Sequence, residues 1–394
     1  MSWNISKLGE ECKIFSGNSI NAKTKENLYT NVEGIPYIAT KDITYDGNIN
    51  YLNGISIPED HQDKFRKAKS ECVFICAEGG SAGRKIAFSD TECFFVNKLF
   101  CLEGGSNLLP KYIYYYLRSE AFQIQFKNAL TGLIGGVSLS KIRLFDITYP
   151  SLPLQKQIVE KLDAAFADID KAISATERNI ENAEALLGKA LDEMAFEKFA
   201  RLGDVFSTGA GGTPLKSNNK FYDDGTIPWI NSGEVNTKEI ITAKKHITEL
   251  GLKNSSAKIF PVNTVLVAMY GATAGQVGIL KFEAATNQAV CGIYQSEAYL
   301  PEFLFYFLTS AKEKIIRQAS GVAQPNISQQ KIKEIQIPVL TIENQYNIVK
   351  KFDSLSKLTN GLLDIYSKKF DNLLSLKSSL LNQALSGELT KDAA

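Results

Sequence analysis

The chain has 394 residues, which is too long for one ordinary core and predicts two or more domains, and its 44% hydrophobic and 22% charged residues are typical of a globular protein. A net charge of +1 excludes a protein that holds nucleic acid through a global positive field, although it leaves local contacts open. The sequence shows no signal peptide and no apolar run long enough to cross a bilayer, so we expect a cytoplasmic protein without membrane contact.

Residues 1–150 predict a first domain of mixed strands and helices. The apolar run from Cys72 to Cys76 predicts a buried strand whose two cysteines face the same side. An aromatic block that opens with Pro110 predicts a helix, and we expect its three tyrosines, 114–116, to pack in the core. The six scattered cysteines are expected to be reduced, and no set of ligands is complete enough for zinc, so we expect no metal and no cofactor.

Residues 151–199 predict one long helix. Its apolar residues advance by threes and fours from Ile158 to Met194, which leaves a single apolar stripe. The segment has ten acidic and six basic residues, a net charge of −4. It is therefore expected to contact protein rather than DNA.

The same succession recurs in the second half of the chain. Residues 200–340 predict a second mixed domain, with a net charge of +3, and residues 341–394 predict a second long helix. Several segments recur in order with a near-constant shift of 190 to 192 residues, which predicts an internal duplication. They are 35–38 with 227–230, 78–83 with 270–275, 109–117 with 300–308, and 158–163 with 348–353.

Two long apolar stripes in one chain predict helices that bury each other as an antiparallel coiled coil. The expected fold class is therefore α+β, with two pseudo-symmetric α/β domains separated by two long helices. Some 40 residues at 1.5 Å each would give a spacer of roughly 60 Å, with one domain at each end.

The sequence contains no catalytic motif that we recognise. The segment Gly211–Ser217 lacks the glycine that precedes the lysine of a phosphate-binding loop, and neither a nucleophile elbow nor a dinucleotide fingerprint is present. His61 and His246 stand among polar residues without a partner at ligand spacing, so we expect both at the surface. The motif of an adenine methyltransferase is absent too. We therefore expect a protein that is not an enzyme.

Short motifs mark the starts of both long helices and the end of the second. Each helix follows a strand that ends in a proline, Pro150 or Pro338, and begins with a Gln-x-x-Ile-Val-x-x-Leu-Asp-like motif at 155–163 or 345–353. Near the end of the second helix, residues 381–389 have the pattern Leu-x-x-Ala-x-x-Gly-Glu-Leu. Because these motifs occur in this order and within a duplicated sequence, the chain resembles the specificity subunits of type I restriction-modification systems. The resemblance covers nearly the whole chain.

That resemblance implies a set of partners. They are double-stranded DNA, two adenine methyltransferase (modification) subunits, and two restriction subunits that act as ATP-dependent translocase and endonuclease. Each domain would read one half of a bipartite, asymmetric DNA site, and the helices would fix the gap between the halves. The flipped adenine would enter a pocket of the methyltransferase.

Two pairs of loops are the candidate DNA contacts. In loops 78–85 and 270–276, small residues that permit close backbone approach precede a polar or basic side chain. Arg84 suits guanine, Gln276 adenine and Lys85 a phosphate, while a plain strand-to-strand turn is an equal alternative. A second pair, Thr40-Lys41 and Asn231-Ser232, is predicted to occupy corresponding places after the Ile-Pro-aromatic-Ile strands. The candidate residues are Thr40, Lys41, Ser81, Arg84, Lys85, Asn231, Ser232, Tyr270, Thr273 and Gln276.

The helical stripes are the candidate docking surface for partner subunits, unless they only bury each other. Their candidate residues are Ile158, Leu162, Phe166, Ile348, Phe352 and Leu355. A self-contained restriction-modification enzyme is a rival hypothesis, but a catalytic domain would have no room after Ala394. A duplicated coiled-coil adaptor that binds a non-DNA partner remains the alternative function. The sequence differences between the two domains favour two different half-sites.

Overall fold

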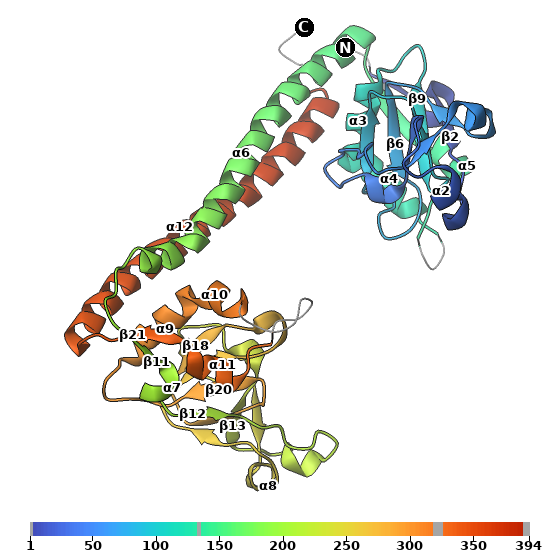
Figure 1. Ribbon diagram of the computed structural model, residues 1–394. Coiled ribbons are helices and arrows are strands. Elements are labelled where there is room, and N and C mark those ends of the chain that lie inside the picture. Colours follow the sequence, from blue (N-terminus) through green and yellow to red (C-terminus); the bar gives the residue numbers. More distant parts are fainter. Residues whose placement is uncertain (1–2, 132–134, 318–325, 389–394) are drawn as a thin grey trace. The chain divides into compact units, whose positions relative to one another are not determined.

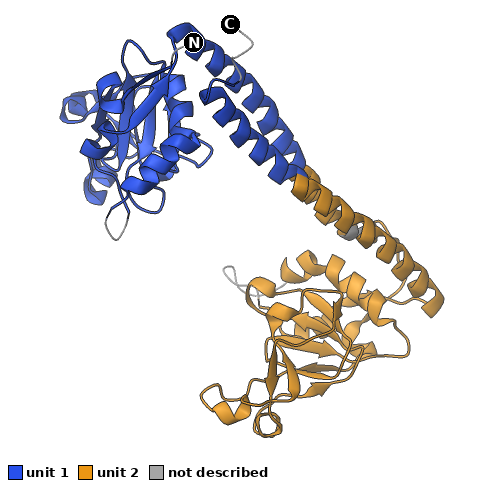
Figure 2. Ribbon diagram, turned by 180° about the vertical axis from the view of Figure 1, so that it is seen from behind, with its two compact units in different colours: residues 1–176, 369–394 blue, residues 177–368 orange. Residues whose placement is uncertain are grey.

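The computed structural model describes residues 3–131, 135–317 and 326–388, which belong to two compact units (Figures 1 and 2). Unit 1 comprises residues 1–176 and 369–394, and unit 2 comprises residues 177–368. Each unit therefore combines one mixed domain with a part of both long helices, so the compact units differ from the four consecutive segments expected from the sequence.

The described part of the domain in unit 1 forms two four-stranded sheets and one two-stranded sheet. The first, β2-β9-β6-β7, is antiparallel, and the second, β4-β3-β8-β5, contains the parallel pair of β3 and β8. The strands are β1 (Asn4–Lys7), β2 (Cys12–Ser16), β3 (Ile35–Ile38), β4 (Ser56–Ile57), β5 (Lys67–Ala68), β6 (Cys72–Cys76), β7 (Ile86–Ser89), β8 (Cys93–Phe95), β9 (Leu99–Gly104) and β10 (Asp146–Tyr149). The helices are α1 (Leu8–Glu11), α2 (Ala22–Leu28), η1 (Thr40–Asp42), η2 (Glu59–Lys64), α3 (Pro110–Arg118), α4 (Glu120–Ala129) and α5 (Leu139–Arg143).

Strand β6 explains how this domain is layered. Successive side chains of a strand point to opposite faces. Val73 and Ile75 enter the core that contains α3, whereas Cys72, Phe74 and Cys76 enter the core between the two sheets. The prediction that both cysteines face the same side is confirmed.

Unit 2 repeats this plan, with a five-stranded sheet β12-β20-β17-β18-β14 and a four-stranded sheet β15-β13-β19-β16 in its described residues. Its central strand, β17, alternates in the same way, since Val265 and Val267 face α9 and Leu266 and Ala268 face the second sheet. The strands are β11 (Phe199–Arg201), β12 (Thr208–Ala210), β13 (Ile227–Ile230), β14 (Glu239–Ile240), β15 (Lys245–Ile247), β16 (Ile259–Phe260), β17 (Val265–Ala268), β18 (Val277–Leu280), β19 (Ala284–Thr286), β20 (Val290–Ile293) and β21 (Gln336–Pro338). The helices are α7 (Leu202–Val205), η3 (Asn219–Phe221), η4 (Ser232–Glu234), α8 (Glu249–Lys253), η5 (Gly271–Thr273), α9 (Pro301–Ser310), α10 (Lys312–Arg317) and α11 (Gln329–Glu334).

The aromatic blocks form α3 and α9, each with its proline at the start of the helix, as expected. Tyr115 and Tyr116 are buried in the core, which confirms that prediction, while Tyr114 is half-buried. His246 is exposed as predicted, whereas the His61 side chain is only 23% exposed. Its ring is half-buried and lies 5.6 Å from that of Tyr29, centroid to centroid.

The two long helices are α6 (Leu152–Asp192) and α12 (Ile342–Leu385). In unit 1, the first part of α6 packs on the last part of α12, where Lys377 Nζ lies 2.6 Å from Asp170 Oδ1 and 4.9 Å from the ring centroid of Phe166. In unit 2, Leu191 near the end of α6 shares a core with Phe352 near the start of α12. The pair is therefore antiparallel, as predicted.

No helix in the described ranges is long and apolar enough to span a membrane. The six cysteines are free and buried. Burial raises the pKa of Cys12 and Cys291 to about 12, so these thiols stay protonated at neutral pH.

We expect Gly211→Ala to lower the free energy of unfolding of unit 2 by about 2 kcal/mol or more. A Cβ at Gly211 would lie 2.1 Å from Thr286 Oγ1 and 2.3 Å from the carbonyl oxygen of Asn287, so the backbone would have to move. Urea unfolding, followed by the fluorescence of buried Trp229 in a Trp3→Phe background, measures the change.

The matched control is Gly233→Ala, because a Cβ there would meet nothing within 4 Å. Its expected effect is within about 0.5 kcal/mol. Equal losses in the two variants would contradict the close packing at residue 211.

Candidate nucleic-acid interface

The candidate loops of the two units have the same backbone frame. One loop joins β6 to β7, and the other joins β17 to β18. The N–H of Gly83 donates to the carbonyl oxygen of Cys76 at 2.9 Å, and the N–H of Gly275 donates to that of Ala268 at 2.8 Å. Both glycines have a positive φ, +72° and +77°, which a side chain disfavours. Each loop is thus a tight strand-to-strand turn, and its function depends on the side chains that it presents.

In unit 1, the two loops that were predicted separately lie together. Lys85 Nζ donates to the carbonyl oxygen of Thr40 at 2.9 Å. The exposed ring of Tyr45 lies beside both cations, with its centroid 5.4 Å from the Arg84 guanidinium and 5.3 Å from the Lys85 ammonium. The Tyr45 hydroxyl is 3.4 Å from Ser81 Oγ. We call these five residues the cation–tyrosine cluster.

Sequence reasoning missed Tyr45. The signal that could have found it is an aromatic residue directly before the turn Asp46-Gly47. Arg118 of α3 donates from Nη1 to the carbonyl oxygen of Asp46 at 2.9 Å and also contacts the Tyr114 hydroxyl. Helix α3 therefore holds the turn that presents Tyr45.

The short helices η1 and η4 correct the predicted correspondence of the second loop pair. Asp42 accepts a hydrogen bond from the N–H of Ala39 at 2.8 Å, and Glu234 accepts one from the N–H of Asn231 at 3.0 Å. These matching caps pair Thr40–Asp42 with Ser232–Glu234, which is one residue away from the predicted pairing. The exposed Lys41 therefore has Gly233 as its counterpart.

Unit 2 presents different side chains on this frame. Tyr270 is exposed, and Thr273 Oγ1 donates to its carbonyl oxygen at 3.3 Å. The side-chain oxygen of Gln276 is buried without a hydrogen-bond partner in the described structure. Asn231 accepts a hydrogen bond from Asn287 Nδ2 at 3.3 Å. Gln276 stands where unit 1 has Arg84, so this loop of unit 2 is neutral where that of unit 1 is cationic.

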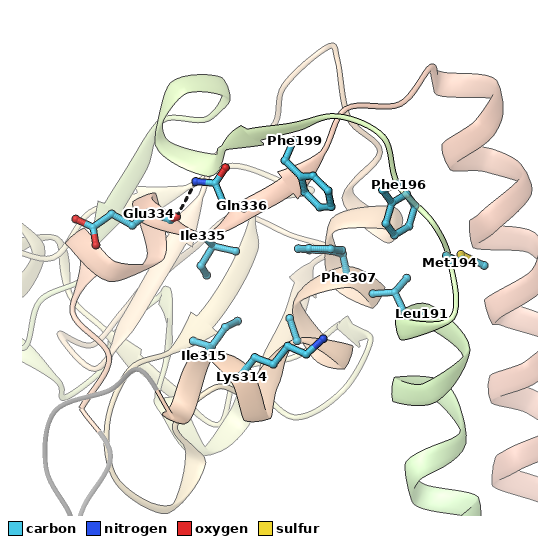
Figure 3. A pocket seen from close by; sticks show the side chains of 11 residues that line it. Leu191, Met194, Phe196, Phe199, Phe307, Lys314, Ile315, Glu334, Ile335 and Gln336 are labelled. Atoms are coloured by element: carbon cyan, nitrogen blue, oxygen red, sulfur yellow. Dashed lines mark hydrogen bonds between the residues drawn. The ribbon is translucent and has the colours of Figure 1, made fainter.

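Unit 2 also contains a pocket of about 390 Å³ beside the end of α6 (Figure 3). The rings of Phe196, Phe199 and Phe307 border it, and its lining is mainly apolar. The charged residues among its described lining are Lys314 and Glu334. Such a lining offers packing and no arrangement for acid–base catalysis.

The structure corrects the choice of residues on the helical stripes. Ile158, Leu162 and Phe166 are buried in the core of unit 1, and Phe352 is fully buried in unit 2. Ile348 and Leu355 are half-buried. The first turns of each helix face their own domain, which the spacing of apolar residues could not reveal. Most of these side chains are therefore occupied within the chain.

A different group of apolar side chains on α12 is open to solvent. Leu358, Leu362 and Ile365 are 66%, 39% and 59% exposed. They are four and three residues apart, so they share one face of the helix. We call them the α12 stripe. The prediction that the two apolar stripes bury each other therefore does not hold at these three residues, which the structure leaves exposed.

Comparison with known proteins tests the resemblance. The family described as "Type I restriction modification DNA specificity domain" matches residues 1–181 and again residues 196–365. The chain belongs to this type I specificity family. The two matches agree with the duplication and with one domain in each unit, so the expected family and fold class are confirmed.

Several members of the type I specificity family are similar over most of their length. The specificity subunit of the EcoR124I/EcoR124II type I restriction enzyme of Escherichia coli is 26% identical over 356 residues, covering 88% of this chain and 84% of that protein. The EcoBI specificity subunit of the same species is 27% identical, covering 91% and 81%.

Solved structures support the fold of this type I specificity protein. A chain from a study of complex assembly and conformational transition in a type I R-M system has a TM-score of 0.77 and 17% identity, covering 97% of both chains. The HsdS subunit from Thermoanaerobacter tengcongensis has a TM-score of 0.54 and 17% identity, covering 98% of this chain and 97% of that one.

Proposed function

We propose that this chain is a non-catalytic DNA reader that recognises a bipartite, asymmetric site, with one half-site read by each domain. The observation that carries the proposal is the cation–tyrosine cluster of unit 1. Arg84 has the fork of donors that matches guanine in the major groove, and Lys85 suits a phosphate. The exposed ring of Tyr45 lies beside both cations, and Arg84 is itself exposed.

The second domain would read a different half-site on the same loop frame. Gln276 stands where unit 1 has Arg84, and a glutamine amide can pair with the donor and acceptor of adenine. Asn231, Ser232, Tyr270 and Thr273 supply further neutral donors and acceptors in the same unit. The contrast with the cationic loop of unit 1 supports an asymmetric site.

The chemistry would belong to partner subunits. We infer that adenine methyltransferase subunits and ATP-dependent restriction subunits, two of each, assemble with the chain, as the family resemblance implies. The α12 stripe supports such docking, because exposed apolar side chains on one face of a helix are suited to burial in an interface. The chain itself would need no cofactor.

The experiment that tests the function is a genome-wide map of methylated adenine in the host with and without this gene. Loss of methylation at one split, asymmetric motif is the expected result. If the map stays unchanged while the partner methyltransferase is active, the role in modification is wrong and the coiled-coil adaptor becomes the better hypothesis.

A single substitution tests the cation–tyrosine cluster. We expect Arg84→Ala to weaken binding of the cognate duplex by about 10- to 100-fold and to relax the choice of one base pair, because a bidentate contact to guanine is lost. The measurement is a binding titration at fixed salt against the cognate duplex and single-base variants of it.

The control is Lys23→Ala, which removes one exposed charge on α2 in the same domain. We expect this control to leave the order of preference among the duplexes unchanged. If both variants weaken all duplexes equally, Arg84 acts only through its charge and reads no base.

A further inference from the structure

A buried glutamine lies in the first turn of each long helix, and its side chain bonds to the adjoining segments of its own unit. Gln155 of α6 is 0% exposed. Its Oε1 accepts a hydrogen bond from the N–H of Leu109 at 2.9 Å. Its Nε2 donates to the carbonyl oxygens of Asn107 and Pro150, at 2.8 and 2.9 Å. The amide thus joins α6 to the start of α3 and to the end of β10.

Gln345 of α12 repeats each of these hydrogen bonds in unit 2. Its Oε1 accepts from the N–H of Leu300 at 2.8 Å, and its Nε2 donates to the carbonyl oxygens of Ala298 and Leu340, at 2.8 and 3.1 Å. This glutamine is also 0% exposed. Both N–H donors of each amide are therefore used, and the same three backbone groups are satisfied in both units.

A second connection lies further along each helix. The Tyr115 hydroxyl donates to Asp163 Oδ1 at 2.6 Å, and Lys111 Nζ lies 2.6 Å from Asp163 Oδ2. In unit 2, the Tyr306 hydroxyl donates to Asp353 in the same way, and a lysine again contacts this carboxylate.

The unit 2 carboxylate is held in its charged form. Partial burial raises the pKa of Asp353, but hydrogen bonds from Lys238 and Tyr306 outweigh this effect and hold the pKa below its ordinary value. The ionised aspartate therefore keeps its connection to the domain at neutral pH.

Two connections on one helix restrict rotation more than one does. The glutamine and the aspartate are eight residues apart in both helices, which corresponds to about 12 Å along the axis. A single connection would act as a pivot, whereas two separated connections fix both the position and the angle of the domain on its helix.

We propose that Gln155 and Gln345 are positioning residues that fix the angle of each domain on its own helix and thereby determine which gap between half-sites is accepted. The inference rests on the proposed reading of a bipartite site. On B-DNA, one added base pair displaces a half-site by about 3.4 Å and turns it by about 35°, so a rigidly held domain rejects it.

The test is Gln155→Met in the complex with the methyltransferase. Methionine has a similar length and removes all three hydrogen bonds. Methylation rates are measured on duplexes that keep both half-sites and differ only in the gap, from two base pairs shorter to two longer. The matched control is Gln157→Met, an exposed position two residues further along α6.

We expect the wild type and Gln157→Met to prefer one gap by roughly tenfold or more, and Gln155→Met to prefer it by roughly threefold or less while reading the same half-sites. An unchanged gap preference in Gln155→Met, even with all rates lowered together, overturns the proposal. If Gln155→Met does not fold, the double variant Lys111→Met and Tyr115→Phe, which removes the second connection and keeps the ring, takes its place with the same expected result. A wild type that methylates no split site would instead refute the proposed function itself.

Discussion

Replacing Phe352 with alanine is expected to lower the free energy of unfolding of unit 2 by about 3 to 5 kcal/mol. Its side chain is fully buried, and its ring lies 5.3 Å from that of Tyr306, centroid to centroid. The cavity left behind would remove the contact between α12 and Tyr306 of α9. It would therefore also loosen the packing around the Tyr306–Asp353 hydrogen bond. Urea unfolding followed by Trp229 fluorescence measures the loss.

Leu358→Ala is the matched control for this prediction. Leu358 lies six residues further along the same helix and is 66% exposed, so its truncation is expected to change the free energy by no more than about 0.5 kcal/mol. If Phe352→Ala were as mild as Leu358→Ala, the packing of α12 on the domain would contribute little to stability.

Charging the α12 stripe is expected to prevent assembly with the methyltransferase subunit. The double variant Leu358→Glu and Ile365→Glu places two carboxylates in the interface that we propose, where unpaired charges are costly to bury. We expect affinity for the partner to fall by about 100-fold or more. The unfolding of the isolated chain should change little, because both positions are exposed.

The control for the stripe is Ile241→Glu with Leu250→Glu. These side chains are 71% and 48% exposed and belong to the same unit, but they lie outside the long helices. Analytical ultracentrifugation of the chain mixed with the methyltransferase separates the outcomes. Normal assembly by the stripe variant would show that the partner docks elsewhere.

Much of the fold could be predicted because its signals are local or repetitive. An uninterrupted apolar run predicts a strand that is buried on both faces, and successive residues of β6 and β17 do enter two different cores. The duplication was visible in the sequence as a constant shift, and it required one architecture to occur twice.

The parts that could not be predicted depend on neighbours far along the chain. Periodicity identified the apolar stripe on α12, but it could not show that Phe352 faces a domain while Leu358 faces solvent. Tyr45 joins the candidate site only because folding brings its turn to Lys85, 40 residues away. Gln155 belonged to a recognisable motif, yet its side chain forms hydrogen bonds with backbone groups of residues 107 and 109, which the motif could not reveal.

The glycines of the candidate loops differ in the space available for a side chain, and this difference affects how the sequences of such proteins can diverge. A side chain at Gly83 would meet the ring of Phe126 at 2.5 Å, whereas one at Gly80 or Gly233 would meet nothing within 4 Å. Mutation can therefore add a side chain at the open positions, Gly80 and Gly233, whereas Gly83 has no space for one and must stay glycine to preserve the loop backbone. If these loops read DNA as we propose, single substitutions at the open positions can change the DNA target and leave folding intact, so recognition specificity can change faster than architecture.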